Sequence, residues 1–395
     1  MQRSAPNARN PRLGQVAALE TGSYIHDPFI LQHTHDMSTP TEDQRQFPLP
    51  RRGDFGWQPL VSAFEPTLED MMSDRSYFGM PPEAVYLWGT FRDEQGEICC
   101  PMRRIPSGLP SDAKDTRRRF YLCSTLGHGD GMHMHPVGRD SVPNDGFSRT
   151  LEDGRIHWRS HPQAPGNRFH VTWTPDDCSW FEEGAIDIKG KLVKPGMQWY
   201  LPGRDAGMYY VANIFEMEGT ILGKKVRGMI GFDPIHMYEG GEIYKTKDAL
   251  VQEKLELVWY TWATRYKDGS IDFGHFTLGH DMFGFAILGN EKGEVRYTYD
   301  VAGEVDFGRN GYWQEGIKYQ AFGQDWEFMP DAKGRLVGLG TLKNPQVDGR
   351  WRRVGDTREP DVWFAWGEAA PGHGSRPMDR LPGAGRRIST GPSRY

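Results

Sequence analysis

Glycine-containing turns recur between runs of aromatic and β-branched residues along most of this chain. They read DEQG at 93–96, EDG at 152–154, DIKG at 187–190, KDG at 267–269, NEKG at 290–293 and DAKG at 331–334. Such a turn between two strand-forming runs is typical of a β-hairpin. Helical signals are sparse, and the best of them lie at 65–74 and 245–256. The succession of turns therefore predicts a meander of antiparallel strands and an all-β chain.

Aromatic residues are numerous, with 13 Trp, 16 Tyr and 20 Phe in 395 residues. The segment LVWYTWATRY at 257–266 places Leu257, Trp259 and Ala263 on one face of a strand, and bulky side chains on the other face as well. An open sheet exposed to water could not cover so many rings, so we expect the strands to form barrels. One face of this strand would pack on another domain or a helix, and the other would line a cavity.

The length of the chain suits two domains better than one hydrophobic core. Two hairpins, LWGTFRDEQGEI and YTWATRYKDGSI, share an aromatic residue, a threonine, an arginine, an acidic turn and a closing isoleucine, which favours a duplicated β domain. We expect an irregular N-terminal arm at 1–56, a first β domain at 57–198, a second β domain at 199–370 and a flexible tail at 371–395.

Charge and hydropathy limit the partners that we expect. A net charge of -6 gives no indication of a nucleic-acid partner or an anionic membrane surface. The chain shows neither the roughly 20 apolar residues of a membrane span nor the apolar core of a signal peptide. The four cysteines form no CxxC motif, so reduced thiols are expected. These features predict a cytoplasmic protein that acts on a small molecule, with a homodimer as one possible assembly.

Two apolar runs at 209–239 are separated by the hairpin sequence GTILGKK. In the first run Tyr210 and Glu216 fall on the strand face opposite Asn213, an amide that needs a hydrogen-bonding partner or a ligand. The second run ends in DPIH, where we expect the proline to end the strand and turn the chain. Asp233 and His236 would then lie at the mouth of whatever the strands enclose.

With FDPIH after GKKVRG and an aromatic strand following, the chain resembles the group that includes carotenoid 1,2-hydratases, AttH-type proteins and fungal Diels–Alderases of similar fold. The resemblance in strand pattern covers 57–368, and its motif is confined to 226–236, after which Met237 and Tyr238 stand where the family has Trp-Gly. The resemblance implies two lipocalin-like antiparallel β-barrel domains in tandem. It also implies a large apolar ligand, and acid/base chemistry without a cofactor.

Asp233 and His236 are the candidate acid/base pair. An apolar cavity raises the pKa of a carboxyl group, and an imidazole transfers protons near neutral pH. The alternative for Asp233 is a cap on a turn, and His275 is either a third catalytic group or a core histidine with its hydrogen bonds satisfied. We expect Tyr210, Asn213 and His280 to contact the substrate. Glu216 either acts in the site or is a solvated strand residue, and Trp259, Tyr260 and Trp262 either line a pocket or fill a core.

The sequence therefore predicts a cofactor-independent enzyme of the hydratase, lyase or isomerase type. Its substrate would be a hydrophobic small molecule of secondary metabolism, such as a terpenoid, steroid, polyketide or aromatic compound. One alternative is a protein that binds such a ligand without turnover. Another is a metal-dependent, cupin-like oxygenase or lyase, because His133 and His135 follow Gly127 in the Gly-x5-His-x-His pattern of cupin metal sites, with His128 as a third ligand. The same segment also reads as a loop that lines the entrance between the domains.

Overall fold

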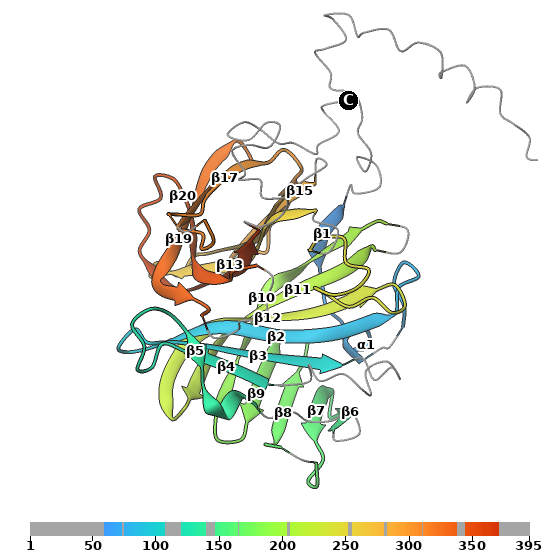
Figure 1. The fold of residues 1–395 in the computed structure, drawn as a ribbon. Helices are drawn as coiled ribbons and strands as arrows, with labels where there is room; N and C mark the ends of the chain where they lie inside the picture. The colour runs from blue at the N-terminus through green and yellow to red at the C-terminus, as the bar shows by residue number, and fades with distance from the viewer. Residues whose placement is uncertain are drawn as a thin grey trace, which may run out of the picture. The chain divides into compact units, whose positions relative to one another are not determined.

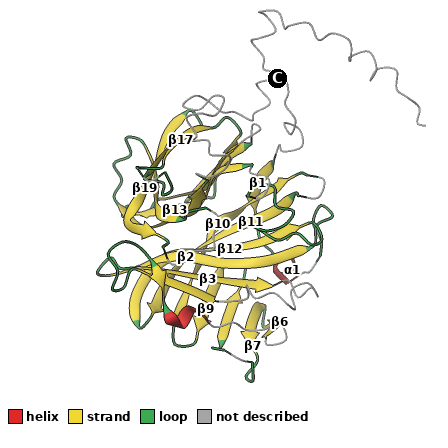
Figure 2. Cartoon of the chain, in the orientation of Figure 1, coloured by secondary structure: helices red, strands yellow, loops and turns green. Residues whose placement is uncertain are grey.

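The computed structural model describes residues 59–72, 75–106, 120–139, 147–164, 166–203, 206–251, 255–279, 283–309, 311–337 and 344–370. These parts consist almost entirely of antiparallel strands (Figure 2). The short helix α1 (Leu68–Met72) follows Thr67, whose Oγ1 accepts the backbone N–H of Asp70 at 3.1 Å and so caps the helix. A 3-10 turn, η3, spans Pro136–Arg139. The all-β prediction is confirmed, whereas the described residues of 245–256 form no helix.

Twelve strands form one large sheet in the order β5-β4-β3-β2-β12-β11-β10-β9-β8-β7-β6, with β1 paired to β10. Figure 1 shows β2, β12, β11 and β10 side by side in this sheet. The strands are β1 (Leu60–Phe64), β2 (Pro82–Asp93), β3 (Ile98–Pro106), β4 (Phe120–Ser124), β5 (His133–Met134), β6 (Phe147–Glu152), β7 (Arg155–Ser160), β8 (Phe169–Trp173), β9 (Asp177–Glu182), β10 (Ile186–Leu201), β11 (Met208–Ile221) and β12 (Lys224–Met237).

The large sheet is curled like half of a barrel. Phe232 on β12 and Trp173 on β8 are four strands apart, a separation of about 19 Å in a flat sheet at roughly 4.8 Å a strand. Their ring centroids lie only 3.8 Å apart. Trp158, Phe215 and further apolar side chains from β2 to β12 fill the concave side completely enough to form a core. The described residues on the concave side of the large sheet therefore form an apolar core.

Two smaller sheets follow in the chain. The five-stranded sheet has the order β16-β15-β14-β13-β21, and the four-stranded sheet has the order β17-β18-β19-β20. A separate apolar core draws its side chains from both sheets, which pack against one another. The strands are β13 (Glu256–Tyr266), β14 (Ile271–Gly279), β15 (Gly284–Asn290), β16 (Val295–Thr298), β17 (Ala302–Asp306), β18 (Gly316–Ala321), β19 (Gln324–Arg335), β20 (Val347–Arg353) and β21 (Pro360–Ala369).

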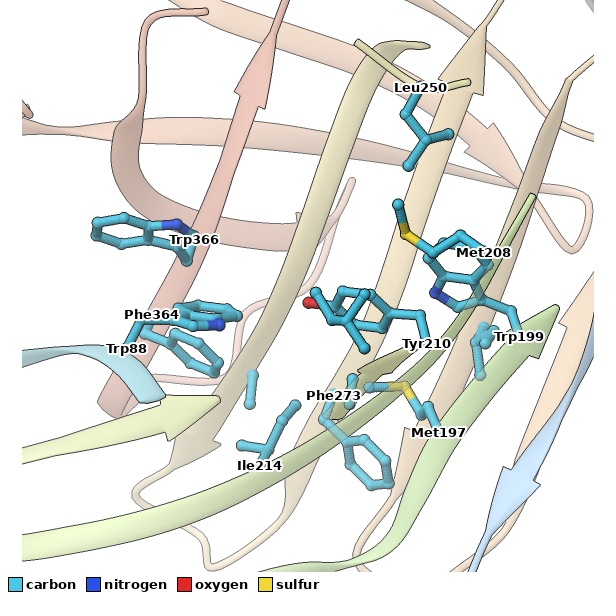
Figure 3. Close-up of a cluster of buried hydrophobic side chains, with 14 of the residues drawn as sticks. Trp88, Met197, Trp199, Met208, Tyr210, Ile214, Leu250, Phe273, Phe364 and Trp366 are labelled. Carbon is cyan, nitrogen blue, oxygen red and sulfur yellow. The ribbon is translucent and has the colours of Figure 1, made fainter. Parts of the chain in front are cut away.

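A third apolar cluster, here called the interface layer, joins the convex side of the large sheet to the five-stranded sheet. It combines side chains of β2, β10, β11 and β12 with side chains of β14, β15 and β21. Figure 3 draws part of this layer and labels, among others, Trp88, Trp199, Tyr210, Phe364 and Trp366. The candidate site lies in this layer.

Four of the six predicted hairpin turns are confirmed, between β2 and β3, β6 and β7, β13 and β14, and β15 and β16. The other two predictions are wrong, because DIKG lies inside β10 and DAKG lies inside β19. Their glycines serve close packing of neighbouring backbones. A Cβ on Gly190 would lie 1.9 Å from the carbonyl oxygen of Glu216, and one on Gly334 would lie 2.1 Å from that of Asp348.

The sheets divide the chain at a different place from the predicted domain boundary between residues 198 and 199. That boundary falls within β10, and the large sheet continues to Met237, after which β13 begins the next sheet at Glu256. The strand pairing therefore favours a division of the chain between Met237 and Glu256. The predicted arm at 1–56 and the predicted tail at 371–395 lie outside the described residues. Among the described residues, no helix is long and apolar enough to cross a membrane.

Candidate active site

Strand β12 carries Asp233 into the interface layer. We expected DPIH to end this strand, and that prediction is wrong, because β12 continues through Pro234 to Met237. Proline is tolerated in strands at irregular positions, and the register of β12 against β2 shifts between Ile235 and His236. Asp233 is therefore a residue of the strand itself. Its alternating position places it on the same face as Met229 and Ile235, which belong to the interface layer.

Two donors converge on the Asp233 carboxyl group, which is completely buried. The indole N–H of Trp88 and the hydroxyl of Tyr210 both donate to its Oδ2, each at 2.5 Å. Its other oxygen, Oδ1, has no hydrogen-bond partner among the described residues. The carboxyl group is thus held by one oxygen and leaves the second without a protein donor.

Glycine makes this arrangement possible. Trp88 on β2 stands opposite Gly231 on β12, two residues before Asp233. A Cβ on Gly231 would lie 2.5 Å from an atom of the Trp88 indole, so any larger residue would displace the ring. The indole therefore lies across Gly231 and reaches Asp233 on the same face of the sheet.

Burial raises the pKa of Asp233 to about 8, and the hydrogen bonds from Tyr210 and Trp88 offset only part of that effect. A carboxyl group with this pKa is mostly protonated at neutral pH. Burial also raises the pKa of the Tyr210 hydroxyl well above its usual range, so the phenol is neutral. At pH 7 the pair therefore consists of a carboxylic acid in contact with a phenol.

Trp259 and His275 lie on the other side of Tyr210, on strands of the five-stranded sheet. The Trp259 ring contacts those of Tyr210 and His275 edge-on, with centroids 5.4 Å and 4.4 Å apart. His275 is fully buried, and one of its ring nitrogens shares a hydrogen bond of 2.8 Å with Thr261. Burial lowers the pKa of His275 to about 3, so its imidazole is neutral. The structure thus brings four predicted site residues together: Asp233, Tyr210, Trp259 and His275.

A small cavity, here called the site cavity, adjoins this group. Its volume is about 80 Å³, and its wall includes Trp88, Tyr210 and Trp259. Tyr210 is among the residues that line the cavity and Asp233 is not, so Tyr210 is the member of the acid pair that borders it. In Figure 3 the Tyr210 hydroxyl points toward the rings of Trp88 and Phe364.

The predicted pairing of Asp233 with His236 does not form. The two residues lie three positions apart on one strand and so face opposite sides of the sheet. His236 packs against Tyr77 and Tyr209, with ring centroids 4.9 Å and 5.5 Å away. Burial lowers the pKa of His236 to about 4, and its Nδ1 has no hydrogen-bond partner among the described residues.

Three further predicted site residues lie outside the site cavity. Asn213 is buried on the opposite face of β11 from Tyr210, and its side chain donates to the carbonyl oxygen of Phe232 at 3.4 Å. Tyr260 and Trp262 belong to the core between the two smaller sheets. The Tyr260 hydroxyl is held there by Gln314 at 2.8 Å. Tyr260 and Trp262 thus fill a core, which is one of the two alternatives that the sequence left open for them.

Glu216 is half-buried and makes an ion pair with Arg265 of the five-stranded sheet, at 2.8 Å. The contact links the two sheets and leaves the Glu216 carboxylate with a fixed partner. His280 lies outside the described residues.

The predicted metal-binding loop partly assembles. The rings of His128 and His133 stack with centroids 3.9 Å apart, and His133 Nε2 lies 2.7 Å from a carboxylate oxygen of Asp130. One ligand atom from each of these three residues, here called the loop cluster, lies within 4.8 Å of the others, so the set is able to hold one metal ion. His135 is not in this set and accepts the backbone N–H of Val137 instead.

Sequence reasoning missed several groups that line the site cavity, above all Trp88, Glu256 and Glu368. Glu368 stands in the apolar run WFAWGEAA, and a charged residue inside such a run was the signal that could have singled it out. Trp88 gave no signal, because its role depends on strand pairing.

A larger hollow of about 790 Å³ is lined mainly by charged and small residues around Arg92 and Arg227 and contains no predicted site residue.

Comparison with known proteins gives structural neighbours only. No model of a protein family matches the chain, and no curated protein matches it. A putative AttH from Nitrosomonas europaea matches with a TM-score of 0.42 and 12% identity, over 76% of this chain and 96% of that one. CghA matches with a TM-score of 0.40 and 12% identity, over 79% and 99% of the two chains. Kievitone hydratase from Nectria haematococca matches with a TM-score of 0.38 and 9% identity, over 77% and 95%. The structural neighbours thus include an AttH-type protein, the group that the sequence resembles.

Proposed function

We propose that the protein is an acid/base enzyme, of the hydratase, lyase or isomerase type, in which Asp233 and Tyr210 transfer a proton to or from a hydrophobic small molecule. The observation that carries this proposal is the buried Asp233 carboxyl group, 2.5 Å from a phenol that lines a cavity. A carboxyl group that burial keeps protonated near pH 7, and that is hydrogen-bonded to a residue lining a cavity, is a candidate for acid/base chemistry. Its pKa of about 8 suits proton transfer near neutral pH.

The short contact supports a proton relay. In the relay the hydrogen bond between the two groups runs the other way: the protonated Asp233 carboxyl group donates to the Tyr210 oxygen. The Tyr210 hydroxyl then passes its own proton to a carbon of the substrate as it receives the proton of Asp233. The resulting Asp233 carboxylate keeps the donors Trp88 and Tyr210 on Oδ2, and these stabilise its charge. In a hydration, water adds to the protonated substrate, and the proton that water releases returns through Tyr210 to Asp233. The reverse sequence is an elimination, and return of a proton to another carbon is an isomerisation.

The size of the site cavity limits which part of a substrate can enter it. About 80 Å³ is small beside the roughly 300–1,000 Å³ of sites that enclose a drug-sized ligand. The segment between β12 and β13 supplies Ile243, Tyr244, Leu250 and Val251 to the wall. The reacting end of a substrate fits the cavity, and we expect the body of a larger substrate to displace this segment.

Hydrogen exchange from solvent tests the proposal even while the overall reaction is unidentified. Wild-type protein in D₂O is incubated with compounds that mass spectrometry finds in the purified protein, and with a panel of apolar ketones and dienes. We expect deuterium to enter a carbon position of at least one compound. Asp233→Asn should slow that incorporation by about 10²- to 10⁴-fold, the usual effect of removing a positioned acid.

Glu216→Gln is the matched control, because it neutralises a carboxylate that lies outside the site cavity. The control should exchange at the wild-type rate. Equal rates for Asp233→Asn and wild type would exclude the relay. Binding of a compound without any exchange would favour the alternative of a ligand-binding protein.

A further inference from the structure

Acidic side chains dominate the polar part of the site cavity. Asp248, Glu256 and Glu368 line it and are 0%, 1% and 2% exposed. No lysine, arginine or histidine is among the described residues that line it. Arg104, which reaches the hydroxyl of the lining residue Tyr86, is already paired with Glu83 at 3.0 Å. The described part of the wall therefore offers three carboxyl groups and no basic side chain.

Glu256 and Glu368 form a carboxyl pair that shares a proton. Burial, and next the neighbouring Glu368, raise the pKa of Glu256 well above its usual range, so Glu256 holds the proton and hydrogen-bonds to Glu368. Burial raises the pKa of Glu368 as well, but hydrogen bonds from Gln346, at 3.0 Å, and from Glu256 lower it, so Glu368 is the member of the pair that ionises first. Glu368 is thus the group at the cavity wall on which a bound cation would hold a negative charge.

A second acceptor stands beside this charge. Gln346 is 5% exposed and lines the cavity, and its Oε1 has no hydrogen-bond partner among the described residues. Its amide nitrogen already donates to Glu368, which fixes how the side chain is turned. A buried acceptor without a donor costs free energy. A ligand that brings N–H groups would satisfy this oxygen.

Half of the remaining described residues of the wall are aromatic. These are Tyr86, Trp88, Tyr210, Tyr244, Trp259 and Trp366. The face of an aromatic ring attracts a cation, most strongly where water is excluded. Carboxylate, carbonyl oxygen and aromatic faces together provide the environment of an ammonium group.

We propose that the site cavity binds a protonated amine, so that the substrate is an apolar molecule that carries a basic nitrogen. This inference rests on the proposed function only in assuming that substrate enters this cavity. The ammonium group would donate to Glu368 and to Gln346 Oε1, and its alkyl substituents would contact the rings. A volume of about 80 Å³ is enough for such a head group. The Asp233–Tyr210 relay would then act on a carbon close to the nitrogen.

Two probes of the same shape test the proposal directly. The tert-butylammonium ion and tert-butyl alcohol differ in charge, and their binding is measured at constant ionic strength by isothermal titration and by ligand-detected NMR. We expect the ammonium ion to bind about tenfold more tightly than the alcohol, or better. Glu368→Gln should abolish this preference, whereas Glu256→Gln should keep it, because it replaces the member that carries the shared proton.

Asp233→Asn separates this inference from the proposed function, since it should remove deuterium exchange and keep the preference for the ammonium ion. Equal binding of the two probes to wild type, or no detectable binding of the ammonium ion, would overturn the inference and leave the relay standing. A preference that survives in Glu368→Gln would also overturn it. Loss of the preference in Glu368→Gln together with normal exchange in Glu216→Gln supports both proposals.

Discussion

Replacing Asp233 by asparagine should stabilise the protein at alkaline pH, although the change removes the proposed acid. Asparagine has nearly the same shape, and its side-chain oxygen accepts the same hydrogen bonds from Trp88 and Tyr210. The amide cannot ionise. The variant therefore avoids the cost of burying a carboxylate in the interface layer.

The magnitude follows from the pKa of Asp233, which rises from 3.8 to about 8 on folding. Between these values the folded chain binds more protons at this site than the unfolded chain, so the stability of the wild type falls as the pH rises. At about 1.36 kcal/mol for each tenfold change in ionisation, the full loss is at most about 6 kcal/mol above pH 8. Structural relaxation makes this loss smaller. We expect the free energy of unfolding of Asp233→Asn to exceed that of the wild type by about 2–5 kcal/mol at pH 9 and to equal it near pH 4.

Urea unfolding of both proteins between pH 4 and pH 9 measures this difference. Asp361→Asn is the matched control, because the hydrogen bond from Arg227 lowers the pKa of Asp361 and its side chain is 32% exposed. Above pH 4 the Asp361→Asn control should be less stable than the wild type, by less than about 1 kcal/mol in the free energy of unfolding. An Asp233→Asn variant less stable than wild type at pH 9, or a difference that does not change with pH, would refute the reasoning. Either result would mean that Asp233 is ionised in the folded protein.

Three further predictions concern other parts of the molecule. Burial lowers the pKa of His275 to about 3, so the unfolded chain binds the extra proton below pH 6.5; His275→Gln should therefore lose less stability than wild type between pH 6.5 and pH 4 in the same assay. The loop cluster should bind Zn²⁺, seen as a rise in melting temperature and by elemental analysis, and His133→Ala should abolish it; a fully folded protein that takes up no metal would exclude the metal-dependent alternative. Arg92 lies 2.6 Å from the buried Asp348, so Arg92→Met should cost about 3 kcal/mol in urea unfolding, and adding Asp348→Asn should restore part of that loss.

The local pattern of the sequence was sufficient for the strands and their faces. Side chains alternate across a strand with a period of two. The placement of Tyr210 and Asn213 on opposite faces of one strand, and of Trp259 and Tyr260 on opposite faces of another, therefore followed from spacing alone and holds in the structure. Hairpin turns with glycine were predicted correctly where the turn chemistry is local. They were wrong at Gly190 and Gly334, where glycine is required by a neighbouring strand.

The composition of the candidate site was decided by tertiary structure. Trp88 and Asp233 are 145 positions apart in the chain, and only the pairing of β2 with β12 brings the indole to the carboxyl group. The same holds for Glu256 and Glu368, which meet because β13 pairs with β21. No local pattern contains such pairings.

Burial separated the titratable residues that the sequence had grouped together. Asp233 and His236 read as a pair because they are close in sequence, yet a strand turns residues three positions apart to opposite faces. One face meets the five-stranded sheet and raises the pKa of a carboxyl group to about 8, while the other face packs an imidazole against two tyrosines. The sequence by itself determined which residues were available for proton transfer. The packing of one sheet on another determined which of them is held as an acid beside a cavity, since the cost of ionising a group depends on how completely that packing removes water from it.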